Sequence, residues 1–283
     1  MGKPDDDEAP ARVHFGPGFH AAVGRPVDRD AYDRYTGAWS RLFVPSLLVA
    51  AEVGAAQRIL DVATGPGEAA LLALEKVGPS GLVVGADISL PMLDAARTRL
   101  ADARFRAIVT DGQRLPFADG QFDAVLCQLG LMFFPEPALG MREFRRVLRP
   151  HHRAAVCVIS APERVPTWSV LADTLGRYLP DQWDVLHLMF SLADASRLEQ
   201  LFAAAGFGEI SVTRETREHD FATFDEYWAP IEVAPGSLPQ AYRALPIALR
   251  QAVREEVRRH LAQFEVNGTL VLTTEMLIGA GRA

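Results

Sequence analysis

Between residues 58 and 159, short apolar runs alternate regularly with stretches of helical spacing. The runs predict strands over 58–63, 82–87, 104–109, 122–127 and 153–159, and the stretches predict helices over 68–77, 91–101 and 137–148. Strand–helix alternation of this kind is typical of a parallel sheet with helices on both faces, joined by right-handed crossovers. The pattern therefore predicts an α/β, Rossmann-like fold.

The two ends of the chain depart from this alternation. Residues 29–54 have helical spacing interrupted by Gly37 and Pro45, which predicts two short helices. The C-terminal part predicts a helix over 191–207, a strand over 208–215, a long helix over about 240–264 and a last strand over 268–283. The aromatic-rich segments 161–190 and 220–269 are expected to be helical lid insertions. Residues 28–283 are thus interpreted as one domain with two insertions.

Composition and charge narrow the function classes. Residues 1–27 begin with the acidic, apolar-poor stretch MGKPDDDEAP, unlike a secretory signal peptide, and are expected to form a flexible tail. No apolar run is long enough to span a membrane, and a net charge of −7 without a basic stripe argues against nucleic acid as a partner. Cys127 and Cys157 lie in strand-like runs without metal-ligand spacing. They are interpreted as buried thiols of a cytoplasmic protein.

The stretch ILDVATGPGEAALLA (59–73) passes from a strand through Gly65 and Gly67 into a helix. Such a turn leaves room for a ligand against bare backbone, and the helix N-terminus offers free N–H groups to an anion. The turn alone is compatible with NAD, with another nucleotide-like cofactor or with a purely structural role.

Three acidic residues favour a ligand site. Asp61 lies inside the first strand, Asp87 ends the second and Asp111 ends the third, where Gly112 follows it. A carboxylate at the end of the second strand is suited to accept both hydroxyls of a ribose. Asp87 and Asp111 can alternatively cap a helix or form a turn. Since all three belong to the carboxyl ends of successive strands, a shared ligand is the preferred interpretation.

Together with later stretches, this pattern resembles the class I S-adenosylmethionine-dependent methyltransferases. The closest resemblance is to the ubiquinone/menaquinone-biosynthesis C-methyltransferase-like (methyltransferase type 11) branch. From about residue 30 to 212, it rests on ILDVATGPGEAALLA, VVGADISLPMLDAAR, VTDGQRLPFADGQFDAVLCQLGLMFFPEPALGMREFRRVLRP and LFAAAGF. The resemblance implies a seven-stranded, mostly parallel sheet, with the last strand antiparallel beside the sixth at the sheet edge. It also implies S-adenosylmethionine as cofactor and in-line methyl transfer to O, N or C of a small molecule.

The resemblance further implies a set of cofactor-binding residues. Those under the methionine moiety are Asp61, Ala63, Thr64, Gly65 and Gly67, while Asp87 takes the ribose and Ile88 and Met92 flank the adenine. Those at the adenine edge are Asp111, Gly112 and Gln113, and those near the sulfonium are Cys127, Gln128 and Leu129. Tyr35 and Trp39 match a segment that often folds over the cofactor, and for them a packing helix is an equal alternative.

The acceptor is expected to be apolar or aromatic because the insertions are rich in aromatic side chains. Trp168, Phe190 and Trp228 are the candidate walls, although each can instead belong to the core of a lid. His187 is a weak candidate for a general base, with a buried structural histidine as the alternative. His151-His152 stands where relatives usually carry two glycines, and it is expected to form a surface turn rather than a metal site.

Two other functions stay open from the residues alone. An NAD(P)-dependent oxidoreductase would call for a Tyr-x-x-x-Lys pair or a His–acid dyad on a suitable loop, and the sequence contains neither. A non-catalytic S-adenosylmethionine-binding protein would look the same, because methyl transfer has no obligatory catalytic residue. Both a monomer and a homodimer are compatible with the sequence.

Overall fold

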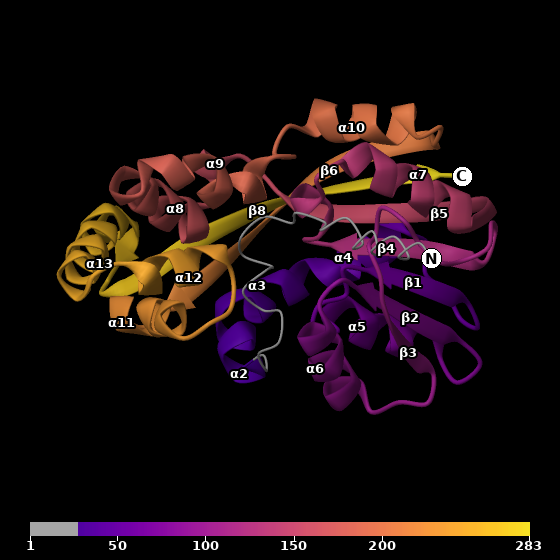
Figure 1. The fold of residues 1–283 in the computed structure, drawn as a ribbon, viewed down its shortest axis with the longest axis horizontal. Coiled ribbons are helices and arrows are strands. Elements are labelled where there is room, and N and C mark those ends of the chain that lie inside the picture. The colour runs from indigo at the N-terminus through magenta and orange to yellow at the C-terminus, as the bar shows by residue number, and fades with distance from the viewer. Residues whose placement is uncertain (1–27) are drawn as a thin grey trace, which may run out of the picture.

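The computed structural model describes residues 28–283, so the tail predicted over 1–27 lies outside the described residues. A central sheet in the order β3-β2-β1-β4-β5-β8-β6 organises these residues (Figure 1). Its strands are β1 (Arg58–Val62), β2 (Leu82–Asp87), β3 (Phe105–Val109), β4 (Phe122–Gln128), β5 (Leu148–Ile159), β6 (Gly208–Phe221), β7 (Glu265–Val266) and β8 (Thr269–Arg282). The pairs among β1 to β5 are parallel, and β8 is antiparallel to both β5 and β6. The predicted α/β, Rossmann-like class is confirmed.

The sheet differs from the prediction in its number of strands. It has eight strands rather than seven, because β7 pairs with the start of β8 across the Asn267-Gly268 turn. Both turn residues have positive φ, as a two-residue hairpin turn requires. As predicted, the last strand, β8, runs antiparallel beside the strand at the sheet edge, since β8 lies between β5 and β6 and β6 forms the edge. Burial explains this order: most of β8 is buried, whereas the charged β6 alternates between exposed and half-buried positions, as suits an edge strand.

Helices cover both faces of this sheet. The helices that pack on the sheet after β1, β2, β4 and β5 are α5 (Glu68–Val77), α6 (Leu90–Leu100), α7 (Pro137–Val147) and α10 (Ala195–Ala204). The strand order reverses between β1 and β4, so right-handed crossovers place α5 and α6 on one face and α7 and α10 on the other. The predicted bounds of these helices hold to within a few residues, and Asp194 caps α10 by accepting a hydrogen bond from the Ser196 amide.

The N-terminal segment is a near-continuous helical path instead of the two predicted helices. It consists of α2 (Arg29–Tyr32), the π-helical turn η1 (Asp33–Gly37), α3 (Ala38–Ser40), the 3-10 turn η2 (Arg41–Phe43) and α4 (Val44–Ala50). Pro45 does not break this path because it lies in the first turn of α4, where its missing N–H has no helical partner.

A cluster of helices surrounds the ends of β6 and β8 that extend beyond the sheet (Figure 1). We call residues 161–190 and 222–264 the helical cap. Its main helices are α8 (Pro166–Tyr178), α9 (Trp183–Leu186), α11 (Phe224–Trp228), α12 (Ser237–Ala244) and α13 (Ile247–Leu261). The single helix predicted over 240–264 is wrong, because Pro246 separates α12 from α13 and forces Leu245 into an extended conformation.

His151 and His152 are part of β5, not of a separate surface turn. His151 is exposed and has a φ of 69°, at a place where the pairing of β4 with β5 is irregular. The predicted surface position of His151 is therefore correct, while the predicted turn is a bulge within a strand. Among the described residues, no helix combines the length and apolar content that crossing a bilayer requires.

Candidate functional site

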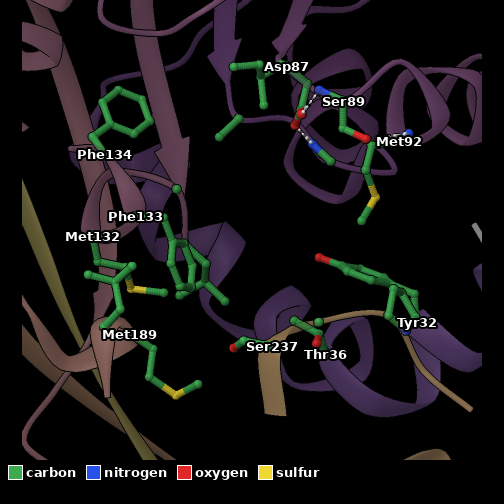
Figure 2. A pocket seen from close by; sticks show the side chains of 18 of the residues that line it. Tyr32, Thr36, Asp87, Ser89, Met92, Met132, Phe133, Phe134, Met189 and Ser237 are labelled. Atoms are coloured by element: carbon green, nitrogen blue, oxygen red, sulfur yellow. Dashed lines mark hydrogen bonds between the residues drawn. The ribbon is translucent and has the colours of Figure 1, made fainter. Parts of the chain in front are cut away.

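A cavity lies at the carboxyl ends of β1, β2 and β4 (Figure 2). Ala63 follows β1, Asp87 ends β2 and Leu129 follows β4, and all three line the cavity. This is the point where the strand order reverses, which is where open α/β sheets bind their ligands. Further lining residues follow β3 and β4 and end β5, and the remaining walls come from the N-terminal segment and the helical cap, so three parts of the fold meet at one site.

The backbone at this edge adopts conformations that favour glycine. Ala63 and Leu129 both have positive φ (56° and 53°), which costs each residue on the order of 1 kcal/mol. Gly130 packs between their strands: a Cβ there would lie 2.4 Å from the Ala63 Cβ and 2.9 Å from the Cys127 Sγ. Gly65 has a φ of 53°, yet a Cβ there would meet only the Tyr32 hydroxyl, at 3.8 Å. The glycine turn therefore presents open backbone to the cavity.

Asp87 connects the glycine turn to the end of β2. Its Oδ2 accepts a hydrogen bond from the Gly65 amide and its Oδ1 accepts one from the Ser89 amide, both at 2.8 Å (Figure 2). Ser89 in turn caps α6 by accepting from the Met92 amide. Burial raises the pKa of Asp87, although its hydrogen bonds oppose the shift. Each carboxylate oxygen keeps a further lone pair with which to accept from a ligand.

Asp61 lies under the glycine turn and is fully buried. Its Oδ2 accepts a hydrogen bond from the Thr64 hydroxyl at 2.6 Å, whereas its Oδ1 is buried without a hydrogen-bond partner among the described residues. Burial raises the pKa of Asp61 to about 7, against the effect of the Thr64 bond. A buried acceptor without a donor is costly, and this oxygen is a place where a donor group is needed.

The turn after β3 is braced by its own side chains. Asp111 accepts hydrogen bonds from the Gln113 amide at 2.8 Å and from the Gln113 side chain at 3.2 Å. The Gln113 Oε1 accepts from the Glu136 amide, so both side chains shape the turn and do not line the cavity. Gly112 does line it, and a Cβ there would lie 2.4 Å from the Phe134 ring.

The structure brings together part of the predicted site. The predicted residues that line the cavity are Tyr35, Ala63, Gly65, Asp87, Ile88, Met92, Gly112, Leu129 and Trp168. Those that lie outside its lining are Trp39, Asp61, Thr64, Gly67, Asp111, Gln113, Cys127, Gln128, His187, Phe190 and Trp228. Residues outside the lining contact the elements that carry the lining residues. For example, the Gln128 amide donates a hydrogen bond to the Ser40 carbonyl, and Trp39 packs against Trp168. Trp228 is buried against Phe224 and Tyr242 inside the cap.

His187 does not face the cavity. Its Nε2 lies 2.7 Å from the Asp173 Oδ1, its Nδ1 lies 2.9 Å from the Trp183 carbonyl, and its ring stacks on Trp183. Both ring nitrogens are therefore engaged by α8 and α9. The neighbouring Leu188 and Met189 do line the cavity, so His187 holds the segment that carries part of its wall.

Several lining residues were not predicted from the sequence. Figure 2 shows the Tyr32 hydroxyl pointing into the cavity from one side and Met132, Phe133 and Met189 on the other, with Thr36 and Ser237 next to each other between them. The sequence does contain a pattern that predicts Tyr32 as a lining residue, because Tyr32 precedes the predicted Tyr35 by one helical turn. It contains no such pattern for Ser237, because only the folding of the cap brings the start of α12 to the carboxyl ends of the strands.

A buried ion network holds the N-terminal segment over the cavity. Arg99 of α6 bonds both Glu68, the first residue of α5, and Asp33 of η1. The Arg41 Nε bonds the Glu68 Oε2 at 2.7 Å. The side chains of Arg99 and Glu68 are only 10% and 5% exposed, so the centre of this network is shielded from solvent, while Asp33 and Arg41 at its ends are partly exposed. Tyr32 and Tyr35 are thereby tied to the helices that follow β1 and β2.

Comparison with known proteins agrees with this geometry. Residues 59–151 match the family model of a methyltransferase domain. The chain is 35% identical over 167 residues to the demethylmenaquinone methyltransferase of Corynebacterium kroppenstedtii, covering 54% of this chain and 69% of the relative. It is 37% identical over 128 residues to the ubiquinone/menaquinone biosynthesis C-methyltransferase UbiE of Xylella fastidiosa, covering 44% and 49%. The match therefore spans about half to two thirds of these relatives.

A solved structure shares the fold. The YcgJ protein of Bacillus subtilis superposes with a TM-score of 0.56 at 19% identity, over 84% of this chain and 97% of YcgJ. At this identity the likeness concerns the fold alone. The sequence matches confirm the resemblance predicted from the motifs.

Proposed function

Because the chain belongs to the S-adenosylmethionine-dependent methyltransferases, in the branch of the ubiquinone/menaquinone-biosynthesis C-methyltransferases, we propose that it methylates a small, ring-bearing apolar acceptor. The observation that carries this proposal is the division of the cavity. One side lies at the carboxyl ends of the strands, and we call it the sheet-edge side. It offers backbone and a carboxylate, while the opposite side offers apolar, aromatic and thioether side chains. The names of the relatives, which act on demethylmenaquinone and in ubiquinone/menaquinone synthesis, support a ring of the quinol type.

The sheet-edge residues fit S-adenosylmethionine, which supplies an electrophilic methyl group on a positively charged sulfur. We assign the ribose hydroxyls to the free lone pairs of Asp87 and the adenine to Ile88, Met92 and the bare backbone of Gly112. Asp61 has the buried, unpartnered oxygen that an ammonium group near the glycine turn would satisfy. The other predicted cofactor residues outside the lining act by shaping these turns, as Thr64 does for Asp61 and Gln113 for Asp111.

The acceptor side contributes alignment and exclusion of water. Phe133, Trp168 and Met189 form apolar walls, and in-line transfer depends mainly on holding the reacting atoms in line inside a dry site. We propose that residues 28–283 form one domain and that the helical cap, which lies within the predicted insertions at 161–190 and 220–269, acts as the lid over its cavity. Phe190 and Trp228 then stabilise the lid rather than touch the acceptor.

Transfer of labelled methyl groups tests this function. The protein is incubated with methyl-labelled S-adenosylmethionine and a panel of quinols, phenols and amines, and the products are identified by mass spectrometry. We expect label in ring-bearing phenols or quinols. The Asp87→Asn variant should bind S-adenosylhomocysteine on the order of tenfold more weakly in calorimetry, because a charge-assisted hydrogen bond is lost. Asp94→Asn, on the exposed face of α6, is the matched control.

Two outcomes would contradict the proposal. Tight binding of S-adenosylhomocysteine without transfer to any member of the panel would indicate a non-catalytic binding protein. Binding of NAD in place of S-adenosylhomocysteine would indicate an oxidoreductase. A small molecule rather than a nucleic acid as partner, and a cytoplasmic location, complete the proposal, with both a monomer and a homodimer left open. The location is supported by the buried, unpaired thiols of Cys127 and Cys157.

A further inference from the structure

On the side of the cavity that faces the helical cap, none of the described lining residues is suited to take a proton. Among the described residues that line the whole cavity, the ionisable ones are Asp87, Tyr32 and Tyr35. Asp87 lies on the cofactor side, bonded to the glycine turn. His187, the predicted base, is engaged by Asp173 and faces away from the cavity. The walls near the cap are Met132, Phe133, Ile159, Trp168, Leu188 and Met189.

The two tyrosines are donors rather than bases. Burial raises the pKa of Tyr32, and so do the nearby carboxylates of Glu68, Asp87 and Asp33, while Arg99 opposes the shift. Burial also raises the pKa of Tyr35 well above its usual value, with a smaller contribution from Tyr227 of α11. Both phenols therefore stay protonated at neutral pH. Neither hydroxyl donates a hydrogen bond to another described residue, so both are available to a ligand.

Hydroxyl groups gather where the N-terminal segment meets the start of α12. The Tyr35 ring lies 3.9 Å from the position that a Cβ would occupy on Gly236. Thr36, which follows Tyr35 in the chain, and Ser237, which follows Gly236, also line the cavity, where they lie next to each other (Figure 2). A cluster of neutral hydroxyls in an apolar wall is suited to a ligand oxygen that carries negative charge, because a buried anion is stable only when it is hydrogen-bonded.

We propose that the acceptor is methylated as the anion of an acidic ring hydroxyl, and that the Tyr35 hydroxyl, with Thr36 and Ser237, donates hydrogen bonds to the acceptor's oxygen. This inference rests on the proposed function. The acceptor loses its proton to solvent before the site closes, so no protein base is needed. An electron pair of the anion then forms the bond to the methyl carbon as the carbon–sulfur bond breaks and its pair stays on sulfur. The positive and negative charges cancel, and a ring carbon methylated in this way releases its own proton afterwards.

The ionisation of a bound phenol tests the inference without turnover. A chromophoric phenol whose ionised form absorbs visible light is titrated with pH while bound to the protein and S-adenosylhomocysteine, which has no methyl group to transfer. We expect the bound phenol to ionise at a lower pH than the free one. Tyr35→Phe should reduce the preference for the ionised form on the order of tenfold, because a hydrogen bond to a charged oxygen is lost. Tyr178→Phe, whose hydroxyl bonds Glu256 outside the cavity, should change nothing.

If Tyr35→Phe does not fold, as judged by thermal melting, Thr36→Val and Ser237→Ala carry the same test with smaller expected shifts. A bound phenol that stays neutral, or an ionisation unaffected by all three variants, would overturn the inference.

The rate of methyl transfer at different pH values separates this failure from that of the proposed function. With phenols of increasing acidity, the midpoint of the pH–rate profile should follow the pKa of the phenol. A midpoint that stays fixed would indicate a protein base and overturn the inference alone, whereas no transfer to any phenol or quinol would contradict the proposed function.

Discussion

The two sides of the cavity are built by different means. At the sheet edge, the geometry comes from backbone and local hydrogen bonds: left-handed Ala63 and Leu129, open Gly65, and Asp87 bonded to Gly65 and Ser89. On the cap side, the walls come from side chains distant in sequence, such as Trp168, Met189 and Leu238, brought together by helix packing. The first side is suited to one fixed cofactor. The lining of the second side can change without disturbing the sheet, so we propose that the cap side determines the choice of acceptor.

The N-terminal segment belongs to both sides, and removing its anchor should have the largest effect. Arg99→Met leaves the buried Glu68 without one of its two arginine partners and releases Asp33. Breaking a buried ion pair costs about 3–5 kcal/mol of unfolding free energy when no partner remains, and we expect a loss at the lower end of this range because Glu68 keeps its bond to Arg41. Hydrogen exchange should also show faster exchange in residues 28–50.

The control for Arg99→Met is Arg97→Met on the same helix. Arg97 pairs with Asp94 at the surface, where such a pair contributes at most about 1 kcal/mol. Equal losses in the two variants would mean that the network does not anchor the segment, and that the two sides of the cavity are more independent than the contacts indicate.

A change at Asp61 should act on the sheet-edge side alone. Its pKa is about 7 in the folded protein, above the value near 3.9 expected when unfolded. The folded state therefore binds more protons between these values, and the contribution of Asp61 to stability falls as pH rises through about 4 to 7. Asp61→Asn keeps the shape but cannot ionise, so its stability should depend less on pH, by about 2–4 kcal/mol across this window.

Urea unfolding at several pH values measures this difference between the wild type and Asp61→Asn. Binding gives a second readout: an ammonium group beside Asp61 would favour its ionised form, so wild-type protein should release protons on binding S-adenosylhomocysteine near pH 7. Parallel stability–pH curves for the two proteins would contradict the assignment of the raised pKa to Asp61.

The sequence predicts more of the sheet-edge side of the cavity than of the cap side, and the reason is physical. The glycine turn, Asp87 and Gly112 follow strands at fixed offsets, so local patterns place them at one edge of a parallel sheet. Trp168 was predicted from composition, whereas Phe190 and Trp228, predicted on the same ground, do not line the cavity. Aromatic residues indicate a core, but which of them faces a ligand depends on how α8, η6 (Leu188–Phe190) and α11 pack.

A change in the cap wall should leave the cofactor side intact. Met189→Ala removes a thioether side chain from the acceptor half, and we expect the KM of the acceptor to rise on the order of tenfold. The affinity for S-adenosylhomocysteine should stay the same, because Met189 belongs to the opposite wall. Leu249→Ala, in the cap but outside the lining, is the control. Equal weakening of both ligands would show that the two sides do not act separately.

The smallest effect is expected at His187, although it was the candidate base. His187→Gln keeps a polar group opposite Asp173 and loses only the stacking on Trp183. We expect kcat to stay within about twofold of wild type and the pH–rate profile to keep its midpoint, since both ring nitrogens are engaged outside the cavity. A modest rise in the acceptor KM is consistent with a looser segment carrying Leu188 and Met189.

His260→Gln, on an exposed position of α13, controls for removal of a histidine. Loss of the acidic limb of the profile in His187→Gln alone would instead make His187 the base, and would move the chemistry of proton transfer from the acceptor to the cap.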